Sequence, residues 1–215
     1  MARENPTSGA SVTAAVRATP VQHDENQDNL VIVRSRTEPA HFAEIYDRHA
    51  AAIHGYLARR IGNARAEDLT ADTFLTAFNS RGRYDPQQDN ARPWLYGIAT
   101  NLLRRERRSE VRQYRALART GIDPVDAGEA DSVVARVAAA GATRQLAAAL
   151  ASLSGGERDV LLLIAWEELS YADVARALDI PIGTVRSRLH SARTRMRSAV
   201  SHLISPDHQE HDVKE

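Results

Sequence analysis

The 215-residue chain has no cysteine, and this absence removes several kinds of site at once. A disulfide framework, a zinc site built from thiolates and a cysteine nucleophile are all excluded. Lysine is scarce as well, because Lys214 is the only lysine among the 28 basic residues and the rest are arginines. The identity of an arginine therefore says little in this chain, and its position says more.

Long hydrophobic runs are also missing. Nowhere do about eighteen apolar residues follow one another, and the N-terminus lacks the apolar run of a signal peptide. We therefore expect a cytoplasmic protein without membrane insertion. The sequence also lacks a glycine-rich phosphate loop, HExxH and GxSxG motifs, and paired carboxylates with a base. We accordingly expect neither an enzyme nor a metal or cofactor site.

The net charge of zero is the sum of blocks that cancel. Residues 92–119 carry eight basic and two acidic side chains, and residues 181–204 carry five basic and no acidic ones. The segment between them, residues 120–180, has four basic and ten acidic side chains. Positive islands in an otherwise acidic chain favour contact with phosphate backbones, because each neutralised phosphate releases condensed counterion.

Apolar residues recur at helical spacing from Leu30 onward, and no alternating stretch is long enough for a sheet. The sequence predicts an all-α protein with two small helical domains joined by a flexible acidic linker. The predicted segments are a disordered N-terminal extension at 1–28, a helical domain at 29–119, the linker at 120–141, a helix-turn-helix domain at 142–204 and a polar tail at 205–215.

In the first domain we expect helices over residues 39–62 and 66–79, then a polar loop over 80–93. A single helix over 93–119 would be about 40 Å long at about 1.5 Å per residue, which exceeds what a small bundle buries. Its surplus length is expected to serve a partner. Trp94 and Tyr96 could stack on bases, although we expect Trp94 to be mostly buried.

The second domain contains a predicted helix-turn-helix at residues 170–197, preceded by a capping box between Ser154 and Glu157. Pro181 and Gly183 are expected to make the turn between its two helices. The second helix has apolar residues at spacings of four, three and four. The opposite face is therefore free to enter a major groove, and it carries Arg186, Ser187, His190, Ser191 and Thr194.

Two further motifs accompany the helix-turn-helix, AEDLTADTFLTAF at 66–78 and RPWLYGIATNLLRRERR at 92–108. In this order the three motifs resemble the bacterial sigma-70 family, specifically its small extracytoplasmic-function (ECF) group, over approximately residues 30–203. The resemblance implies a first domain that binds core RNA polymerase and melts the minus-ten promoter element. It implies a second domain that reads the minus-thirty-five element, and neither domain is catalytic in that family.

The resemblance also implies roles for individual residues. Asp68 and Asp72 are the expected contacts with core polymerase, although the family commonly has Gln-Glu where this chain has Ala71 and Asp72. An anti-sigma factor is a candidate partner whose existence the sequence leaves open. The expected minus-ten residues, on duplex or single-stranded DNA, are Gln87, Gln88, Asp89, Asn90, Arg92, Asn101, Arg104, Arg105 and Arg108. The expected minus-thirty-five residues are Thr184, Arg186, Ser187, His190, Ser191, Arg193 and Arg195.

Other interpretations remain open from the residues alone. The chain would also fit a regulator that binds an operator by itself, with the first domain used for dimerisation or sensing. That interpretation leaves the arginine-rich helix after Trp94 unexplained. Without the resemblance, Asp68 and Asp72 would be an ordinary solvated face. The acidic linker fits a mimic of nucleic acid and a simple flexible tether equally well.

Overall fold

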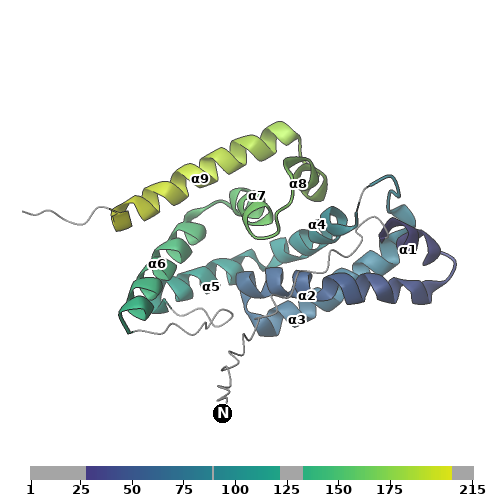
Figure 1. The fold of residues 1–215 in the computed structure, drawn as a ribbon, viewed down its shortest axis with the longest axis horizontal. Coiled ribbons are helices and arrows are strands. Elements are labelled where there is room, and N and C mark those ends of the chain that lie inside the picture. Colours follow the sequence, from purple (N-terminus) through teal and green to yellow (C-terminus); the bar gives the residue numbers. More distant parts are fainter. Residues whose placement is uncertain (1–27, 89, 122–132, 205–215) are drawn as a thin grey trace, which may run out of the picture.

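The computed structural model describes residues 28–88, 90–121 and 133–204, and every regular element within these ranges is a helix. The predicted all-α fold with two small helical domains is confirmed. The helices form stacked layers, with α2 and α3 on one side, α4 and α5 in the middle, and α7, α8 and α9 on the other side (Figure 1). The extension before residue 28 and the tail after residue 204 lie outside the described residues.

The N-terminal half is a bundle built around a helical hairpin. Gly62 closes the hairpin with a φ of 84°, a conformation that favours glycine over residues with a Cβ. The predicted helices over 39–62 and 66–79 are both present, each with slightly different ends. The elements are α1 (Asp28–Arg34), a 3-10 turn (Pro39–His41), α2 (Phe42–Ile61), α3 (Asn63–Ser80), a second 3-10 turn (Arg81–Arg83) and α4 (Arg92–Leu103).

The single helix considered for residues 93–119 is not continuous in the structure. A 3-10 segment, Arg104–Glu106, interrupts it after α4, and α5 (Arg107–Thr120) follows. Tyr114 and Glu110 on α5 are each only 1% exposed. The helix extends beyond the first bundle as expected, but one of its faces is covered by α6 of the same chain.

The C-terminal half consists of α6 (Val133–Ser152), α7 (Gly155–Ala165), α8 (Tyr171–Leu178) and α9 (Ile182–Ile204). The predicted capping box at the start of α7 is present, because Ser154 and Glu157 each accept from the other's backbone N–H. The linker predicted for residues 120–141 overlaps α6 from Val133 onward, and residues 122–132 lie outside the described ranges.

The turn of the helix-turn-helix is made by a residue that the sequence did not single out. Asp179 ends α8 with a φ of 51°, whereas Gly183 already lies inside α9. Aspartate tolerates this left-handed conformation better than most residues, because its short side chain can bond locally. The predicted apolar face of α9 is confirmed, since Val185, Leu189 and Ala192 are all buried.

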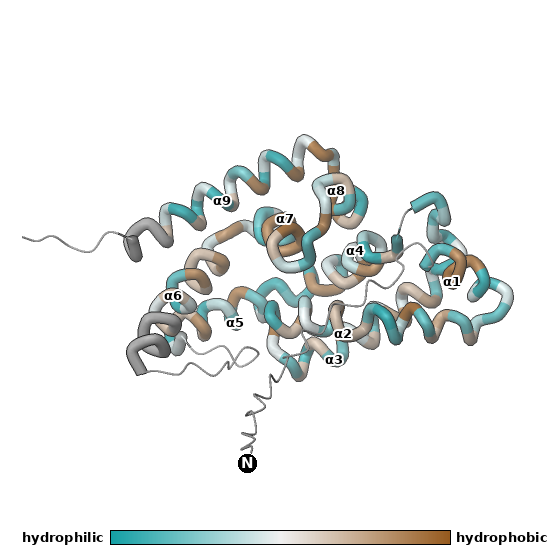
Figure 2. Tube along the Cα trace, in the orientation of Figure 1, coloured by the Kyte–Doolittle hydropathy of each residue, from teal (hydrophilic) through white to brown (hydrophobic). Residues whose placement is uncertain are grey.

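The two halves pack directly against each other. Helix α4 lies on α8, and α5 lies on α6. A Cβ built on Gly97 of α4 would lie only 2.5 Å from the carbonyl oxygen of Ala177 in α8, so this approach requires a glycine. Figure 2 shows hydrophobic residues on α4 and α7, whereas on α9 single hydrophobic residues recur among hydrophilic ones along the helix. We call this packing the closed arrangement.

Candidate nucleic-acid interface

Helix α3 presents an exposed acidic face. Asp68 and Asp72 both point to solvent, one turn apart. Arg65 holds Asp68 at 3.0 Å and Glu106 at 2.6 Å, so this face is joined to the segment after α4. Leu75 follows on the same face and is 59% exposed. Sequence reasoning did not select Leu75, although its spacing of seven from Asp68 placed it on this face.

The polar loop before α4 is anchored to α1 at two points, Tyr84 and Gln88. The Tyr84 hydroxyl donates to Asn29 Oδ1 at 2.5 Å, and the Asn29 amide donates to the carbonyl of Gln88. This anchoring fixes the backbone and leaves the tip of the loop at the surface. Of the predicted loop residues, Gln87 is exposed, Gln88 and Asn90 are half-buried, and Asp89 lies outside the described residues.

The predicted minus-ten residues on α4 and beyond divide into two sets. Asn101, Arg105 and Arg108 are exposed. Arg92 and Arg104 instead reach the C-terminal half of the chain. Arg92 Nη2 donates to the carbonyl oxygen of Glu167 at 2.6 Å, and Arg104 Nε lies 3.5 Å from a carboxylate oxygen of Asp159.

Glu167 is the centre of a second set of contacts with α2 and α4. Its carboxylate accepts from Arg59 Nη2 at 2.9 Å and from the hydroxyl of Tyr96. Burial, followed by the neighbouring Glu167 carboxylate, raises the pKa of Tyr96, so the phenol keeps its proton and donates. Tyr96 is 1% exposed and does not face solvent in the closed arrangement. Trp94 is half-buried, with its ring 4.9 Å from that of Tyr84.

A buried ionic network lies beneath this seam and joins the two halves. Arg60 donates to Glu110 at 2.7 Å and to Asp159 at 2.6 Å, and Arg158 donates to Glu110 at 2.9 Å. All four residues are at most 2% exposed. The sequence does not indicate this network. Arg59 and Arg60 lie in the last turn of α2, and arginines at this position usually stay in solvent, where their charge interacts favourably with the helix dipole.

The outer face of α9 carries most of the predicted minus-thirty-five residues. Arg186, Ser187, His190 and Arg193 are exposed, and Thr184 is half-buried near the start of the helix. Among the residues that the structure describes, no carboxylate forms an ion pair with Arg186 or Arg193. Their charges are therefore available to a partner.

Two other predicted residues on α9 face their own domain. The Ser191 hydroxyl donates to a carboxylate oxygen of Glu157, and Arg195 Nη1 lies 3.1 Å from the other oxygen. The bond from Ser191 is the main reason that the pKa of Glu157 falls to about 2. Ser191 and Arg195 thus support the start of α7, and Arg195 remains half exposed.

Comparison with known proteins decides the family. The model of sigma-70 region 2 matches residues 45–113, and the model of sigma-70 region 4 matches residues 143–196. The ECF RNA polymerase sigma factor SigL of Mycobacterium tuberculosis is 34% identical over 167 residues, which cover 77% of this chain and 92% of SigL. The chain belongs to the sigma-70 family, in its ECF group.

Two further comparisons agree with this conclusion. RNA polymerase sigma factor CarQ of Myxococcus xanthus is 33% identical over 165 residues, covering 75% of this chain and 90% of CarQ. The sigma factor RpoE from Bartonella quintana, solved in complex with the anti-sigma factor NepR, shares the fold with a TM-score of 0.54. It is 23% identical and aligns over 74% of this chain and 96% of that one.

As a sigma factor, the chain directs promoter-specific initiation by core RNA polymerase. Its region 2 match contains the acidic face of α3, the polar loop and α4. Its region 4 match contains α7, α8, the turn that follows α8, and α9 as far as residue 196. Within the described ranges, no helix is long and apolar enough to cross a membrane.

Proposed function

We propose that Asp68, Asp72 and Leu75 form the docking face for core polymerase. The three residues share one exposed face of α3, where two carboxylates lie beside an apolar side chain. A surface of this composition suits a specific protein contact, in which an apolar anchor is surrounded by charges that orient the partner. Ala71 lies on the same helix face and adds no polar group.

The polar loop and α4 are proposed to bind the minus-ten element. The anchored loop holds Gln87, Gln88 and Asn90 next to the arginine-rich helix, where amides can pair with an unstacked base. Asp89 belongs to the same loop in the sequence. Asn101, Arg105 and Arg108 would contact the phosphate backbone at once, and Arg92 and Arg104 would do so after leaving Glu167 and Asp159.

The outer face of α9 is proposed to read the minus-thirty-five element in the major groove. Arg186, Ser187 and His190 lie near the start of the helix, the end that carries base contacts in helix-turn-helix proteins. Arg193 lies two turns later, where phosphates are within reach. Thr184 would support the helix start, and Ser191 and Arg195 would act mainly by holding Glu157.

The closed arrangement adds a condition to this function. Because Arg92, Arg104 and Tyr96 contact the C-terminal half, the two halves must separate before the whole minus-ten surface is free. Core polymerase would supply this separation by binding the open form preferentially. An anti-sigma factor, as in the complex of the Bartonella relative, would act on the same equilibrium. The chain itself is proposed to work in the cytoplasm, where its polymerase partner is, without catalysing a reaction.

A transcription assay with core polymerase tests the docking face. With Asp68 and Asp72 both changed to arginine, initiation and core binding should fall at least tenfold, while the helical content stays that of the wild type. The matched control changes two exposed acidic residues elsewhere, Glu38 and Asp47, to arginine and should retain activity. Equal losses in the two variants would indicate a general charge effect. An unchanged affinity in the first variant would remove this face of α3 from the polymerase interface.

A loop exchange tests the minus-ten assignment separately. Replacing residues 87–90 should redirect the preference for an unpaired promoter base, because the wrong base leaves hydrogen-bonding groups unsatisfied. A loss of transcription that is equal on all minus-ten variants would assign the loop a structural role. The rival function, an operator-binding regulator, would require promoter footprints by the isolated chain without polymerase.

A further inference from the structure

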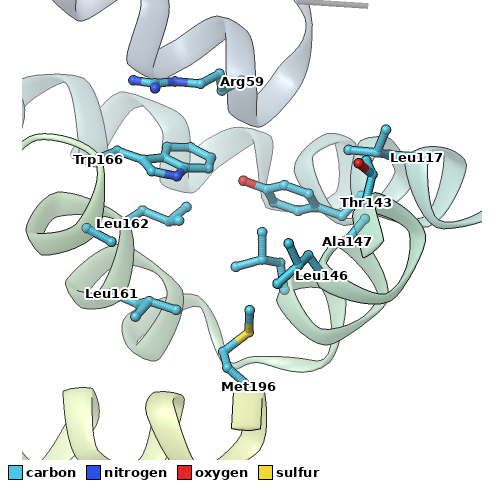
Figure 3. Close-up of a pocket in the computed structure, with 12 residues that line it drawn as sticks. Arg59, Leu117, Thr143, Leu146, Ala147, Leu161, Leu162, Trp166 and Met196 are labelled. Atoms are coloured by element: carbon cyan, nitrogen blue, oxygen red, sulfur yellow. The ribbon is translucent and has the colours of Figure 1, made fainter. Parts of the chain in front are cut away.

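A cavity of about 420 Å³ lies at the seam between the two halves of the closed arrangement. Its walls come from α2 and α5 on one side and from α6, α7 and α9 on the other. Figure 3 shows Arg59 beside Trp166 at one end, Met196 at the other, and Leu162 and Leu146 on facing sides. The volume falls within the range of about 300 to 1,000 Å³ that is typical of small-molecule sites.

Most of the lining is apolar. Arg59, which pairs with Glu167, and Thr143 add polar groups, and Tyr114 is the polar lining residue that is fully buried. Tyr114 lines the cavity and is 1% exposed, and its hydroxyl has no hydrogen-bond partner in the part of the chain that the structure describes. A buried hydroxyl without a partner is rare and costs free energy, because it has lost its bonds to water. Its ring is held in place by Arg158, 5.5 Å from the ring centre. The hydroxyl therefore lacks a hydrogen bond that a molecule entering the cavity would supply.

The chain's own undescribed segments are poor candidates to fill this space. Residues 122–132, IDPVDAGEADS, contain four carboxylates, and residues 205–215 are polar and acidic. Residues 1–27 consist mainly of small and polar types with no large apolar cluster. Burying such charged segments against leucine, methionine and tryptophan would cost more than it gains. The chemistry of the walls instead favours an apolar occupant from outside the chain.

We propose that this cavity binds a small uncharged molecule that is mostly apolar and carries one group that hydrogen-bonds to Tyr114. The binding site requires the closed arrangement, because both halves contribute walls. A ligand that binds one form of a protein shifts the population toward that form. The ligand therefore stabilises the closed arrangement and opposes the opening that the proposed function requires.

The binding test uses the full chain and camphor, a compact apolar molecule with one carbonyl acceptor. Trp94 and Trp166 are the two tryptophans of the chain, so the Trp94→Phe variant leaves Trp166, in the cavity wall, as the sole tryptophan fluorophore. Camphor should change this fluorescence saturably and raise the melting temperature. In the same background Tyr114→Phe should weaken binding about tenfold, the loss expected for one buried hydrogen bond.

Two variants on α6 separate the cavity from other sites. Ala147→Leu places a larger side chain in the cavity and should abolish binding. Ala148→Leu makes the same change at the neighbouring exposed position, which does not line this cavity, and should leave binding intact. Equal affinity in both variants would place camphor elsewhere and overturn the proposal. If camphor causes no fluorescence change in the Trp94→Phe protein, the proposal is overturned as well, and the cavity is then a packing defect that binds no ligand.

The consequence for transcription rests on the proposed function and is measured separately. If polymerase binds the open form, camphor at ten times its Kd should raise the apparent Kd for core polymerase about elevenfold. Tyr114→Phe should reduce this effect in proportion to its weaker binding. If camphor binds saturably but the affinity for core polymerase does not change, the binding site is supported. The same result contradicts the proposal that polymerase requires the open form.

Discussion

The two surfaces proposed to face a promoter differ in how many of their arginines already contact other residues of the chain. On α9, Arg186 and Arg193 are exposed and form no ion pair with the described residues. Arg92 at the start of α4 contacts the carbonyl of Glu167, and Arg104, directly after the end of α4, lies beside Asp159. The closed chain therefore presents the surface proposed to read duplex DNA, while it covers part of the surface proposed to bind the minus-ten element. Recognition of the two elements should differ in its dependence on opening.

The difference has a thermodynamic consequence for assembly. Opening separates Arg59 from Glu167 and Arg60 from Asp159, and these contacts have to be replaced. Buried charges that lose one partner are costly, so the open form is the minor one until polymerase binds it. If the proposed function is correct, this arrangement keeps the proposed minus-ten surface out of non-specific contacts with nucleic acid.

The largest effect is expected from breaking the buried network beneath the covered surface. Arg60→Ala leaves Glu110 and Asp159 without their shared cation and should lower the free energy of unfolding by about 3 to 5 kcal/mol. Urea denaturation followed by circular dichroism measures this loss. Arg65→Ala is the matched control, because Arg65 also pairs with two carboxylates but is exposed, and it should change stability little. Similar losses for both would show that burial does not set the strength of this network.

The exposed surface is tested by separating base contacts from phosphate contacts on α9. Arg186→Ala should cost about 1 to 3 kcal/mol on the preferred minus-thirty-five sequence and flatten discrimination between sequences. Arg193→Ala, at the exposed position proposed to contact phosphate, should weaken all sequences alike and lower the slope of log affinity against log salt by about 0.9. A salt titration of holoenzyme on matched and mismatched duplexes measures both quantities. Sequence-independent losses for both variants would contradict the assignment of Arg186 as a base reader.

Opening the seam should affect the two surfaces differently. Gly97→Ala would place a methyl group against the carbonyl of Ala177, and a backbone atom cannot move aside as a side chain can. The affinity of the free chain for a single-stranded minus-ten oligonucleotide should rise about tenfold, the effect of removing roughly 1.4 kcal/mol of closure. Affinity for a minus-thirty-five duplex should stay unchanged. Fluorescence anisotropy with both probes measures the two affinities.

Two further variants test whether this result comes from opening the seam. Gly55→Ala adds the same methyl group to α2 where no atom lies within 4 Å, and it should alter neither affinity. Glu167→Gln leaves α4 itself unchanged, weakens the contacts from Arg59 and Tyr96, and should act in the same direction as Gly97→Ala. Parallel gains on both probes would mean that the seam covers the two surfaces equally.

The smallest effect concerns the support beneath the exposed surface. Because the pKa of Glu157 is lowered to about 2 in the folded chain, its stabilisation is present above the ordinary value of 4.5 and is lost as the pH falls from 4.5 toward 2. Ser191→Ala should lower stability by about 1 kcal/mol at pH 7. The difference in melting temperature between variant and wild type should shrink across that pH window. A difference that stays constant down to pH 2 would exclude Glu157 as the titrating group.

Local features of the fold were predictable because their physical causes lie within a few residues of sequence. The capping box at Ser154 and the buried stripe through Val185 and Leu189 follow from fixed spacings along one helix. The turn was predicted at the correct place but assigned to Gly183, whereas Asp179 adopts the left-handed conformation. Composition rules favour glycine there, and they cannot show which residue of a short turn takes the strain.

The contacts that cover part of the proposed minus-ten surface could not be predicted in this way. The contacts of Glu167 with Arg59, Tyr96 and Arg92 join positions 71 to 108 residues apart, and no periodicity links them. Arg92 begins α4 directly after the loop, and no feature of the neighbouring sequence indicates its contact with Glu167 in the other half. The need for glycine at position 97 likewise arises only from the approach of α8, which lies about 80 residues away in the sequence.

A distance measurement between the two halves tests the closed arrangement most directly. The chain has no cysteine, so Asn79→Cys on α3 and Thr194→Cys on α9, both at exposed positions, provide specific sites for a fluorophore pair. The free protein should show one predominant short distance, and addition of core polymerase should convert it to a longer one. Gly97→Ala should shift the free protein toward the longer distance. A free protein that already shows the distance found in the holoenzyme would contradict the covered minus-ten surface.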